Sequence, residues 1–156
     1  MTETTLTDTP RGESRRGDWR EAGRGWGARA KEWAYLFEPY SRPVNQTVFD
    51  RCGVGSGTEL LDIGCGSGFA LRLAADRGAV VAGLDASSSL VEIARARTPE
   101  ADLRVGDMDA LPWDSGSFDV VTSFNAIWAD CAPAAAEAAY RSAWEAVDTD
   151  SAPSWP

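Results

Sequence analysis

Apolar residues along this chain follow two spacings in turn, and the alternation predicts a regular succession of strands and helices. Four short runs read as strands, and they lie at 58–64, 79–85, 101–107 and 118–126. The first two are apolar in their middle, as strands buried on both faces of a sheet are. Longer segments carry apolar residues at helical spacing, and they lie at 67–78, 87–98 and 133–147. Strands that alternate with helices predict an α/β fold with a parallel sheet and right-handed crossovers.

The two ends of the chain lack this alternation. Residues 1–27 are rich in Thr, Gly, Arg and Glu without an apolar period, and we expect a disordered leader there. Residues 28–53 carry aromatic residues at helical spacing with two interrupting prolines, which predicts a helical segment ahead of a core at 58–147. Residues 148–156 are polar and contain prolines, and we expect them to form a tail.

Composition limits the classes of partner. The 156 residues suit one domain, and 44% hydrophobic residues suffice for a core. The formal net charge of −9 is concentrated after residue 31, and an acidic surface repels phosphate backbones, so we expect no nucleic-acid partner. The sequence has no apolar run long enough to span a membrane and no apolar signal segment near its start, which predicts a cytoplasmic protein without a membrane contact.

Cysteine and histidine content removes several kinds of chemistry. Cys52, Cys65 and Cys131 are widely spaced and form no CxxC pair, so neither a disulfide framework nor a zinc site is expected. The chain contains no histidine, which is the commonest general base and metal ligand. We therefore expect no metal and no Ser–His–Asp or Cys–His mechanism within this chain, and we assign no catalytic residue.

A glycine-rich loop follows the first predicted strand. Gly64, Gly66 and Gly68 open the next helix, where glycine allows a sharp turn or a close approach to a ligand. A tight strand–helix turn without a ligand is the alternative interpretation. Asp85 ends the second strand, where a carboxylate can accept hydrogen bonds from both ribose hydroxyls or can cap the following helix. The loop and the acid together indicate a ligand that contains a ribose.

Two residues distinguish between possible nucleotides. A dinucleotide fingerprint has its third glycine where this chain has Phe69. Asp62, directly before the loop, suits an ammonium group better than a pyrophosphate. Both features favour S-adenosylmethionine over NAD, and an NAD(P)-binding oxidoreductase is the less favoured alternative.

Three stretches carry a resemblance to a known family. "LLDIGCGSGFALRLA", "AVVAGLDAS" and "LRVGDMDALPWDSGSFDVVTSFNAIW" resemble, in the right order, the motifs of class I S-adenosylmethionine-dependent methyltransferases. They are most similar to the methyltransferase type 11-like branch typified by ubiquinone and sterol methyltransferases. The resemblance implies a Rossmann-like three-layer sandwich that binds S-adenosylmethionine and transfers its methyl group in line to a small-molecule acceptor.

The same resemblance implies roles for individual residues. The glycine loop and the ends of strands one and four would hold the methionine moiety, and the ends of strands two and three would hold the ribose and adenine. The cofactor-binding residues that it implies are Asp62, Gly64, Cys65, Gly66, Gly68, Asp85, Ala86, Asp107, Met108 and Asn125. On the substrate side it implies Trp128 and the aromatic residues Tyr35 and Tyr40 of a helical lid. As alternatives to these binding roles, Asp107 would be a turn residue and the aromatic residues would pack in the core.

The resemblance also implies a longer sheet than this sequence supplies. The family's strand order is 3-2-1-4-5-7-6, whereas this chain provides strands for 3-2-1-4 alone, and we expect a C-terminally truncated, incomplete sheet. The fourth strand would then be an exposed apolar edge, which invites self-association. A fragment that binds the cofactor with little or no turnover is therefore the alternative to a working enzyme.

Overall fold

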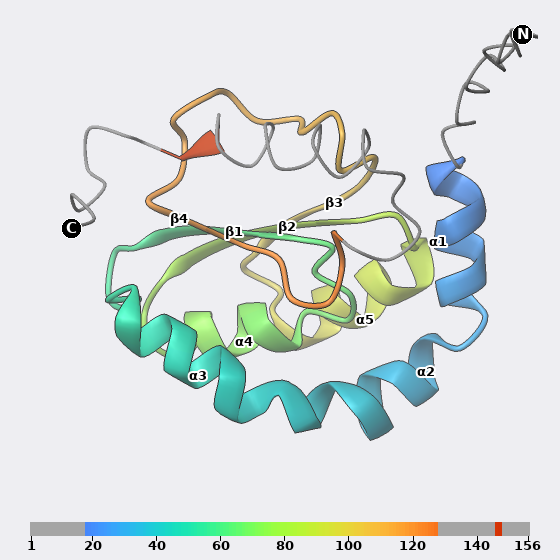
Figure 1. Cartoon of the computed structure of the whole chain (residues 1–156), viewed down its shortest axis with the longest axis horizontal. Helices are drawn as coiled ribbons and strands as arrows, with labels where there is room; N and C mark the ends of the chain where they lie inside the picture. The colour runs from blue at the N-terminus through green and yellow to red at the C-terminus, as the bar shows by residue number, and fades with distance from the viewer. Residues whose placement is uncertain (1–17, 128–145, 148–156) are drawn as a thin grey trace, which may run out of the picture.

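The fold is a parallel sheet with helices packed on one face, as Figure 1 shows. The computed structural model describes residues 18–127 and 146–147. Its strands are β1 (Glu59–Ile63), β2 (Val80–Asp85), β3 (Asp102–Val105) and β4 (Val120–Thr122). They form one sheet in the order β3-β2-β1-β4, and every pairing is parallel. The predicted α/β class and the 3-2-1-4 order are confirmed.

The helices divide into an N-terminal segment and two crossovers. The crossover helices are α4 (Phe69–Ala75) and α5 (Ser88–Arg97). The segment ahead of the sheet contains α1 (Trp19–Gly27), α2 (Ala30–Glu32), a π-helical turn η1 (Trp33–Phe37), a 3-10 turn η2 (Glu38–Ser41) and α3 (Arg42–Arg51). Figure 1 shows α3, α4 and α5 along the same face of the sheet, with α1 at its β3 side. None of the helices in the described part of the chain is long and apolar enough to cross a membrane.

Alternation along the strands produces two apolar clusters. Leu60, Val81 and Leu103 face α4 and α5, in a cluster that also contains Phe49 of α3. The opposite face of the sheet presents a second set, which comprises Leu61, Ile63, Ala82, Phe118 and Ala146. The loop after β3 covers this second face in part. The helix predicted at 133–147 lies outside the described residues except for its last two positions.

The fourth strand is shorter than predicted. The apolar run at 118–126 forms a strand over Val120–Thr122 alone, because the chain turns away immediately afterwards at Asn125, whose φ is +57°. Before the strand, Phe118 forms an isolated parallel bridge with Val147 and donates its N–H to the Ala146 carbonyl at 3.1 Å. Among the described residues, no strand pairs with the outer edge of β4.

The predicted leader is a helix over part of its length. Residues 1–17 lie outside the described residues, but the expectation of disorder is wrong for Trp19–Gly27, which forms α1. Asp18 begins the helix by accepting a hydrogen bond from the Arg20 N–H at 3.0 Å. The glycine-rich sequence has a low helix propensity, which is why disorder was expected. Two of these glycines pack against the segment that follows β2, and this packing favours the helix.

Candidate cofactor site

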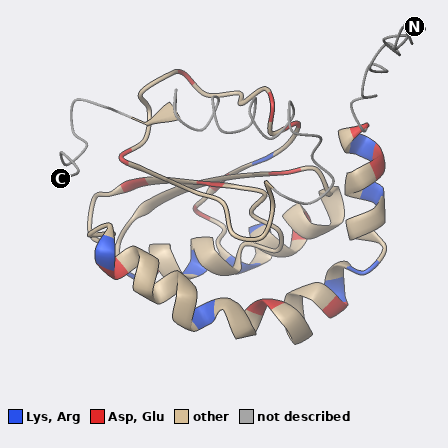
Figure 2. Cartoon of the chain, in the orientation of Figure 1, with Lys and Arg blue, Asp and Glu red and all other residues tan. Residues whose placement is uncertain are grey.

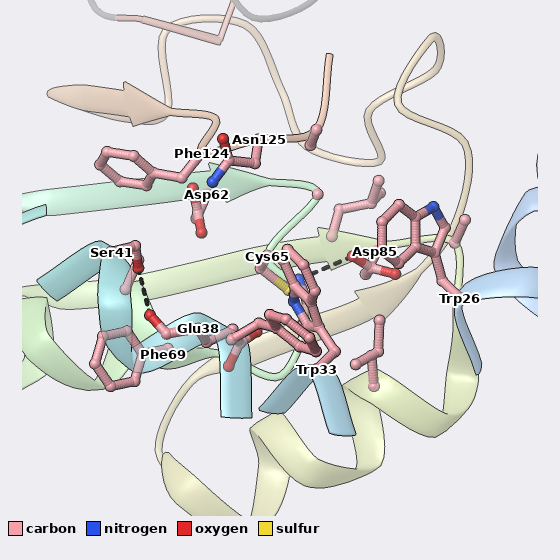
Figure 3. Close-up of a pocket in the computed structure, with 18 of the residues that line it drawn as sticks. Trp26, Trp33, Glu38, Ser41, Asp62, Cys65, Phe69, Asp85, Phe124 and Asn125 are labelled. Carbon is pink, nitrogen blue, oxygen red and sulfur yellow. Dashed lines mark hydrogen bonds between the residues drawn. The ribbon is translucent and has the colours of Figure 1, made fainter. Parts of the chain in front are cut away.

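A cavity of about 440 Å³ lies at the carboxyl ends of β1 and β2 and under the N-terminal helical segment. Figure 3 shows Asp62 and Phe124 toward one end of it and Asp85 with Trp26 toward the other. Trp33 and Glu38 close it from the side of the helical segment. Ligands of parallel α/β sheets bind at this edge, so the cavity lies where the topology predicts a site.

The glycine loop has the backbone that its glycines predict. Gly64, Gly66 and Gly68 adopt φ values of +70°, +55° and +75°, in the left-handed region that side chains disfavour. Close neighbours add a second constraint, because a Cβ on Gly64 would lie 2.2 Å from the Ala126 Cβ. A Cβ on Gly66 would lie 2.8 Å from a carboxylate oxygen of Glu38. The loop therefore packs closely between Ala126 and Glu38.

Every backbone N–H from 64 to 68 donates a hydrogen bond within the protein. The acceptors, in order along the loop, are the Leu84 carbonyl for the first two N–H groups, Asp85 Oδ2, Glu38 Oε1 and the Cys65 carbonyl. A phosphate-binding loop needs such N–H groups free to face its anion. Because all five N–H groups of this loop are already paired, the loop has no donor to offer a pyrophosphate, and binding of a pyrophosphate is disfavoured.

Asp62 is a buried carboxylate at the end of β1. Its side chain is 2% exposed and lines the cavity, and Oδ1 accepts a hydrogen bond from Thr122 Oγ1 at 2.8 Å. Burial raises the pKa of Asp62 to about 7. The hydrogen bond from Thr122 lowers this pKa, and the nearby carboxylates of Asp85 and Glu38 raise it further. A cationic group in the cavity would favour the ionised form.

Asp85 orders two backbone segments at the end of β2. Oδ2 accepts from the Gly66 N–H and Oδ1 from the Ser87 N–H, each at 2.8 Å. Burial raises the pKa of Asp85, and these two hydrogen bonds oppose the rise. The sequence left ribose binding and helix capping open for this residue. The structure shows that Asp85 shapes the turn before α5, where Ser87 is the N-cap, and also lines the cavity.

Glu38 was not expected at the site. Its carboxylate is 7% exposed and accepts hydrogen bonds from the Ser67 N–H at 3.0 Å and from the Ser67 hydroxyl. Arg97, at the end of α5, pairs with it at 2.8 Å and donates to the Ala34 carbonyl at 2.8 Å. An acid within the aromatic run 33–40 was the available signal, but its partners lie 29 and 59 residues away in sequence.

Helix α1 contributes a wall that the sequence did not predict. Gly23 lies against the turn after β2, where a Cβ would be 2.1 Å from the Ala86 carbonyl oxygen. This close approach brings Trp26 to the cavity, and its ring contacts Trp33 edge-on with centroids 5.3 Å apart. Two indoles therefore border the cavity, Trp33 between Asp85 and Glu38 and Trp26 beside Asp85 (Figure 3).

Most of the residues expected at the site line the cavity. They are Asp62, Gly64, Cys65, Gly66, Asp85, Ala86, Met108, Asn125 and Tyr40. Gly68 lies behind it as the N-cap of α4, and Asp107 caps its own turn by accepting from the Asp109 N–H at 3.1 Å. Tyr35 is 64% exposed and covers the Arg97 guanidinium instead. Trp128 lies outside the described residues.

The charge of the cavity is acidic. Glu38, Asp62 and Asp85 line it, and among the described residues an arginine pairs with Glu38 alone of the three. Figure 2 shows acidic positions within the sheet as well as on helices, whereas basic positions lie mostly on helices. Burial raises the pKa of the Cys65 thiol well above its usual value, so this cysteine is not a thiolate nucleophile. The described residues contain no cluster of side chains that could hold a metal ion.

Comparisons with known proteins agree with this geometry. A methyltransferase domain family matches residues 60–150, more than half of the chain. A probable S-adenosylmethionine-dependent methyltransferase of Mycolicibacterium smegmatis is 39% identical over 84 residues, which cover 54% of this chain and 32% of that protein. Nocamycin O-methyltransferase of Saccharothrix syringae is 37% identical over 92 residues, which cover 54% of this chain and 33% of that protein. The chain thus spans about a third of the length of these curated relatives.

The fold has solved counterparts. A TehB-like S-adenosylmethionine-dependent methyltransferase from Corynebacterium glutamicum superimposes with a TM-score of 0.66 at 23% identity. The superposition covers 79% of this chain and 69% of that one. With the matched domain, the strand order and the glycine loop in agreement, the chain belongs to the class I S-adenosylmethionine-dependent methyltransferase family, whose cofactor is S-adenosylmethionine.

Proposed function

We propose that this chain forms the cofactor-binding part of a methyltransferase that moves the methyl group of S-adenosylmethionine to a small-molecule acceptor. One observation carries the proposal. The cavity at the strand ends is lined by carboxylates, while every N–H of its glycine loop is already paired. Such a site suits a cation with hydroxyl groups and disfavours a pyrophosphate, which separates S-adenosylmethionine from NAD.

The cavity offers a place for each part of the cofactor. Asp62 would accept from the ammonium group of the methionine moiety, and Asp85 would accept from the ribose hydroxyls. Ala86 and Met108 would lie beside the adenine ring, at the end of the cavity where Asp85 is found. Asn125, held at the opposite rim by its left-handed backbone, would face the methyl-transfer site.

The residues around the cavity would promote transfer by placement and by exclusion of water. When bound, the cofactor supplies a methyl group on a positively charged sulfur, an electrophile that needs little further activation. Trp26 and Trp33 border the cavity and would favour a cation over their ring faces. The helical segment would keep water out and hold the acceptor in line with the methyl group. The proton that the acceptor loses would pass to water, to a carboxylate or to a tyrosine, because the chain has no histidine.

The acceptor would enter at the lid. Phe37, Tyr40 and Val44 line the cavity and are 58%, 84% and 58% exposed, so an apolar surface leads into it. Nocamycin O-methyltransferase, one of the relatives, carries a small-molecule acceptor in its name. Both observations support a small organic molecule as the methyl acceptor.

Ligand-dependent unfolding tests the proposal. We expect S-adenosylhomocysteine to raise the melting temperature in a concentration-dependent manner and NAD to leave it unchanged, because stabilisation follows ligand occupancy. Incubation with S-adenosylmethionine labelled in its methyl group and a panel of phenols, carboxylic acids and amines would then report transfer. Stabilisation by NAD alone would contradict the proposal.

A cofactor-binding protein without turnover is the second candidate. Strand β4 (Val120–Thr122) pairs with β1 on one side, and no strand among the described residues pairs with its other side. Just before β4, Phe118 forms a single parallel bridge with Val147. An apolar edge of this kind would pair with the same edge of a second copy. Light scattering after gel filtration would detect a dimer. Cofactor binding by a monomer that shows methyl transfer would exclude this candidate.

A further inference from the structure

Asn45 of α3 is a buried amide with an unpaired oxygen in the cavity wall. Its side chain is 1% exposed and lines the cavity, and Oδ1 has no hydrogen-bond partner among the residues that the structure describes. Buried polar atoms in folded proteins are nearly always paired, since an unpaired one costs free energy. A group that is absent from the ligand-free protein would explain this oxygen.

The position of Asn45 along its helix places it at one end of the cavity. Ser41, Asn45 and Phe49 are spaced four residues apart and so share one helix face. Ser41 and Asn45 line the cavity, and the Phe49 ring lies 6.1 Å from that of Phe124. Figure 3 shows Ser41 and Phe124 on the Asp62 side of the cavity, away from Trp26. Asn45 therefore belongs to the Asp62 end.

Within the described ranges, 18–127 and 146–147, no neighbouring group supplies the missing donor. All N–H groups of the loop from 64 to 68 are used elsewhere, and the hydroxyl of Ser41 donates to the Glu38 carbonyl at 2.7 Å. The Thr122 hydroxyl donates to Asp62. A ligand group that brings several N–H donors to this end of the cavity would satisfy both Asn45 and the neighbouring carboxylate. A primary ammonium group has three such donors.

We propose that Asn45 is a further binding residue, whose Oδ1 accepts a hydrogen bond from the ammonium group of the cofactor's methionine moiety, beside Asp62. The inference rests on the proposed function, because it requires S-adenosylmethionine in this cavity. It assigns a residue of the N-terminal helical segment to the amino-acid end of the ligand. The same hydrogen bond would tie that segment to the bound ligand.

Two ligands and one substitution test the assignment. S-adenosylhomocysteine carries the ammonium group, whereas 5′-methylthioadenosine lacks the whole amino-acid part. Asn45→Leu is close in size and removes the polar atoms, and Gln46→Ala changes the exposed amide next to it on the same helix. We expect Asn45→Leu to weaken S-adenosylhomocysteine binding about 10-fold by calorimetry, as the loss of one such hydrogen bond does. It should leave 5′-methylthioadenosine binding within about 2-fold, and Gln46→Ala should change neither.

Thermal unfolding without ligand gives an independent reading. If Oδ1 is unpaired until a ligand arrives, Asn45→Leu removes a buried unsatisfied group and should raise the melting temperature by about 3 °C. A lower melting temperature, or failure to fold in both Asn45→Leu and the milder Asn45→Ala, would show a structural role and overturn the inference. Equal loss of affinity for both ligands would also overturn it. Unchanged affinity of Asn45→Leu for S-adenosylhomocysteine would overturn the role of Asn45 alone. If the wild-type protein binds neither ligand, the proposed function itself fails.

Discussion

Arg97 Nη1 lies 2.8 Å from Glu38 Oε2 and joins the end of α5 to the segment that covers the cavity. Glu38 also accepts from Ser67 in the glycine loop, and Arg97 donates to the Ser67 and Ala34 carbonyls. The pair therefore connects the lid, the loop and a crossover helix. It is largely buried, with side chains 19% and 7% exposed, so its two charges depend on each other.

Removing the arginine should destabilise the protein strongly. Arg97→Leu leaves the Glu38 carboxylate buried without its counter-charge, and we expect a loss of about 3 kcal/mol in the free energy of unfolding, measured in urea. Arg72→Leu is the matched control, because its side chain is 35% exposed and pairs with the exposed carboxylates of Asp76 and Glu100, which should be worth about 0.5 kcal/mol. Adding Glu38→Gln to Arg97→Leu should restore part of the loss. No recovery in the double variant would show that the charge is not the cause.

Two glycines of α1 should respond in opposite directions to alanine. A Cβ on Gly23 would meet the Ala86 carbonyl oxygen at 2.1 Å, whereas a Cβ on Gly25 would meet no atom of the described residues within 4 Å. Gly25→Ala should strengthen the helix by about 1 kcal/mol, since alanine has the higher helix propensity. Gly23→Ala should separate α1 from the loop after β2.

Limited trypsin digestion distinguishes the two variants. Arg20 and Arg24 lie in α1, so cleavage there reports whether the helix is packed. We expect Gly23→Ala to be cleaved faster than wild type and Gly25→Ala more slowly. Equal cleavage of both variants would mean that α1 does not depend on this contact.

The stability of the ligand-free protein should fall as the pH rises toward 7. Asp62 has a pKa of about 7 in the folded protein, whereas an aspartate in an unfolded chain titrates near ~4. The folded state therefore keeps its proton to higher pH, and the free energy of unfolding decreases between about pH 4 and pH 7. Asp62→Asn should remove most of this slope in urea titrations. A slope of the same size in Asp62→Asn would assign it to another group.

Cofactor binding should show the opposite dependence on pH. An ammonium group favours ionised Asp62, so the affinity for S-adenosylhomocysteine should rise as the pH increases through about 7 and level off above it. Calorimetry near pH 7 in buffers of different ionisation enthalpy should detect proton release from the protein. Binding to Asp62→Asn should be weak and independent of pH over this range.

Asp85 should combine a structural and a binding role. Asp85→Asn replaces one oxygen by an NH₂ group that faces the N–H of Gly66 or Ser87, and we expect a loss of about 2 kcal/mol in stability. If Asp85 also binds ribose, wild type should prefer S-adenosylhomocysteine to its 2′-deoxy analogue by about 10-fold, and the variant should lose that preference. A preference that survives in Asp85→Asn would limit this residue to the turn.

Local pattern determined the sheet and the loop. Apolar runs predicted β1 and β2, because a strand covered on both faces needs apolar residues throughout. The shorter β3 and β4 were predicted from their place between helical segments. The glycines at 64, 66 and 68 predicted a sharp turn or a close approach, and each of them adopts a left-handed backbone. The fourth strand was predicted too long, since nothing in its composition shows that the chain turns at Asn125.

Tertiary structure decided what surrounds that loop. Glu38, Trp26 and Asn45 lie on a segment that sequence treated as leader and lid, and their partners are distant along the chain. Helix α1 forms because Gly23 lets it approach the loop after β2, a contact that its own propensity would not predict. Sequence alone thus determined the cofactor family through strand ends and spacing. Whether the loop's N–H groups are free depended on acceptors that lie up to 29 residues away along the chain. Which buried amide awaits a donor depended in the same way on tertiary packing, because no local period records such contacts.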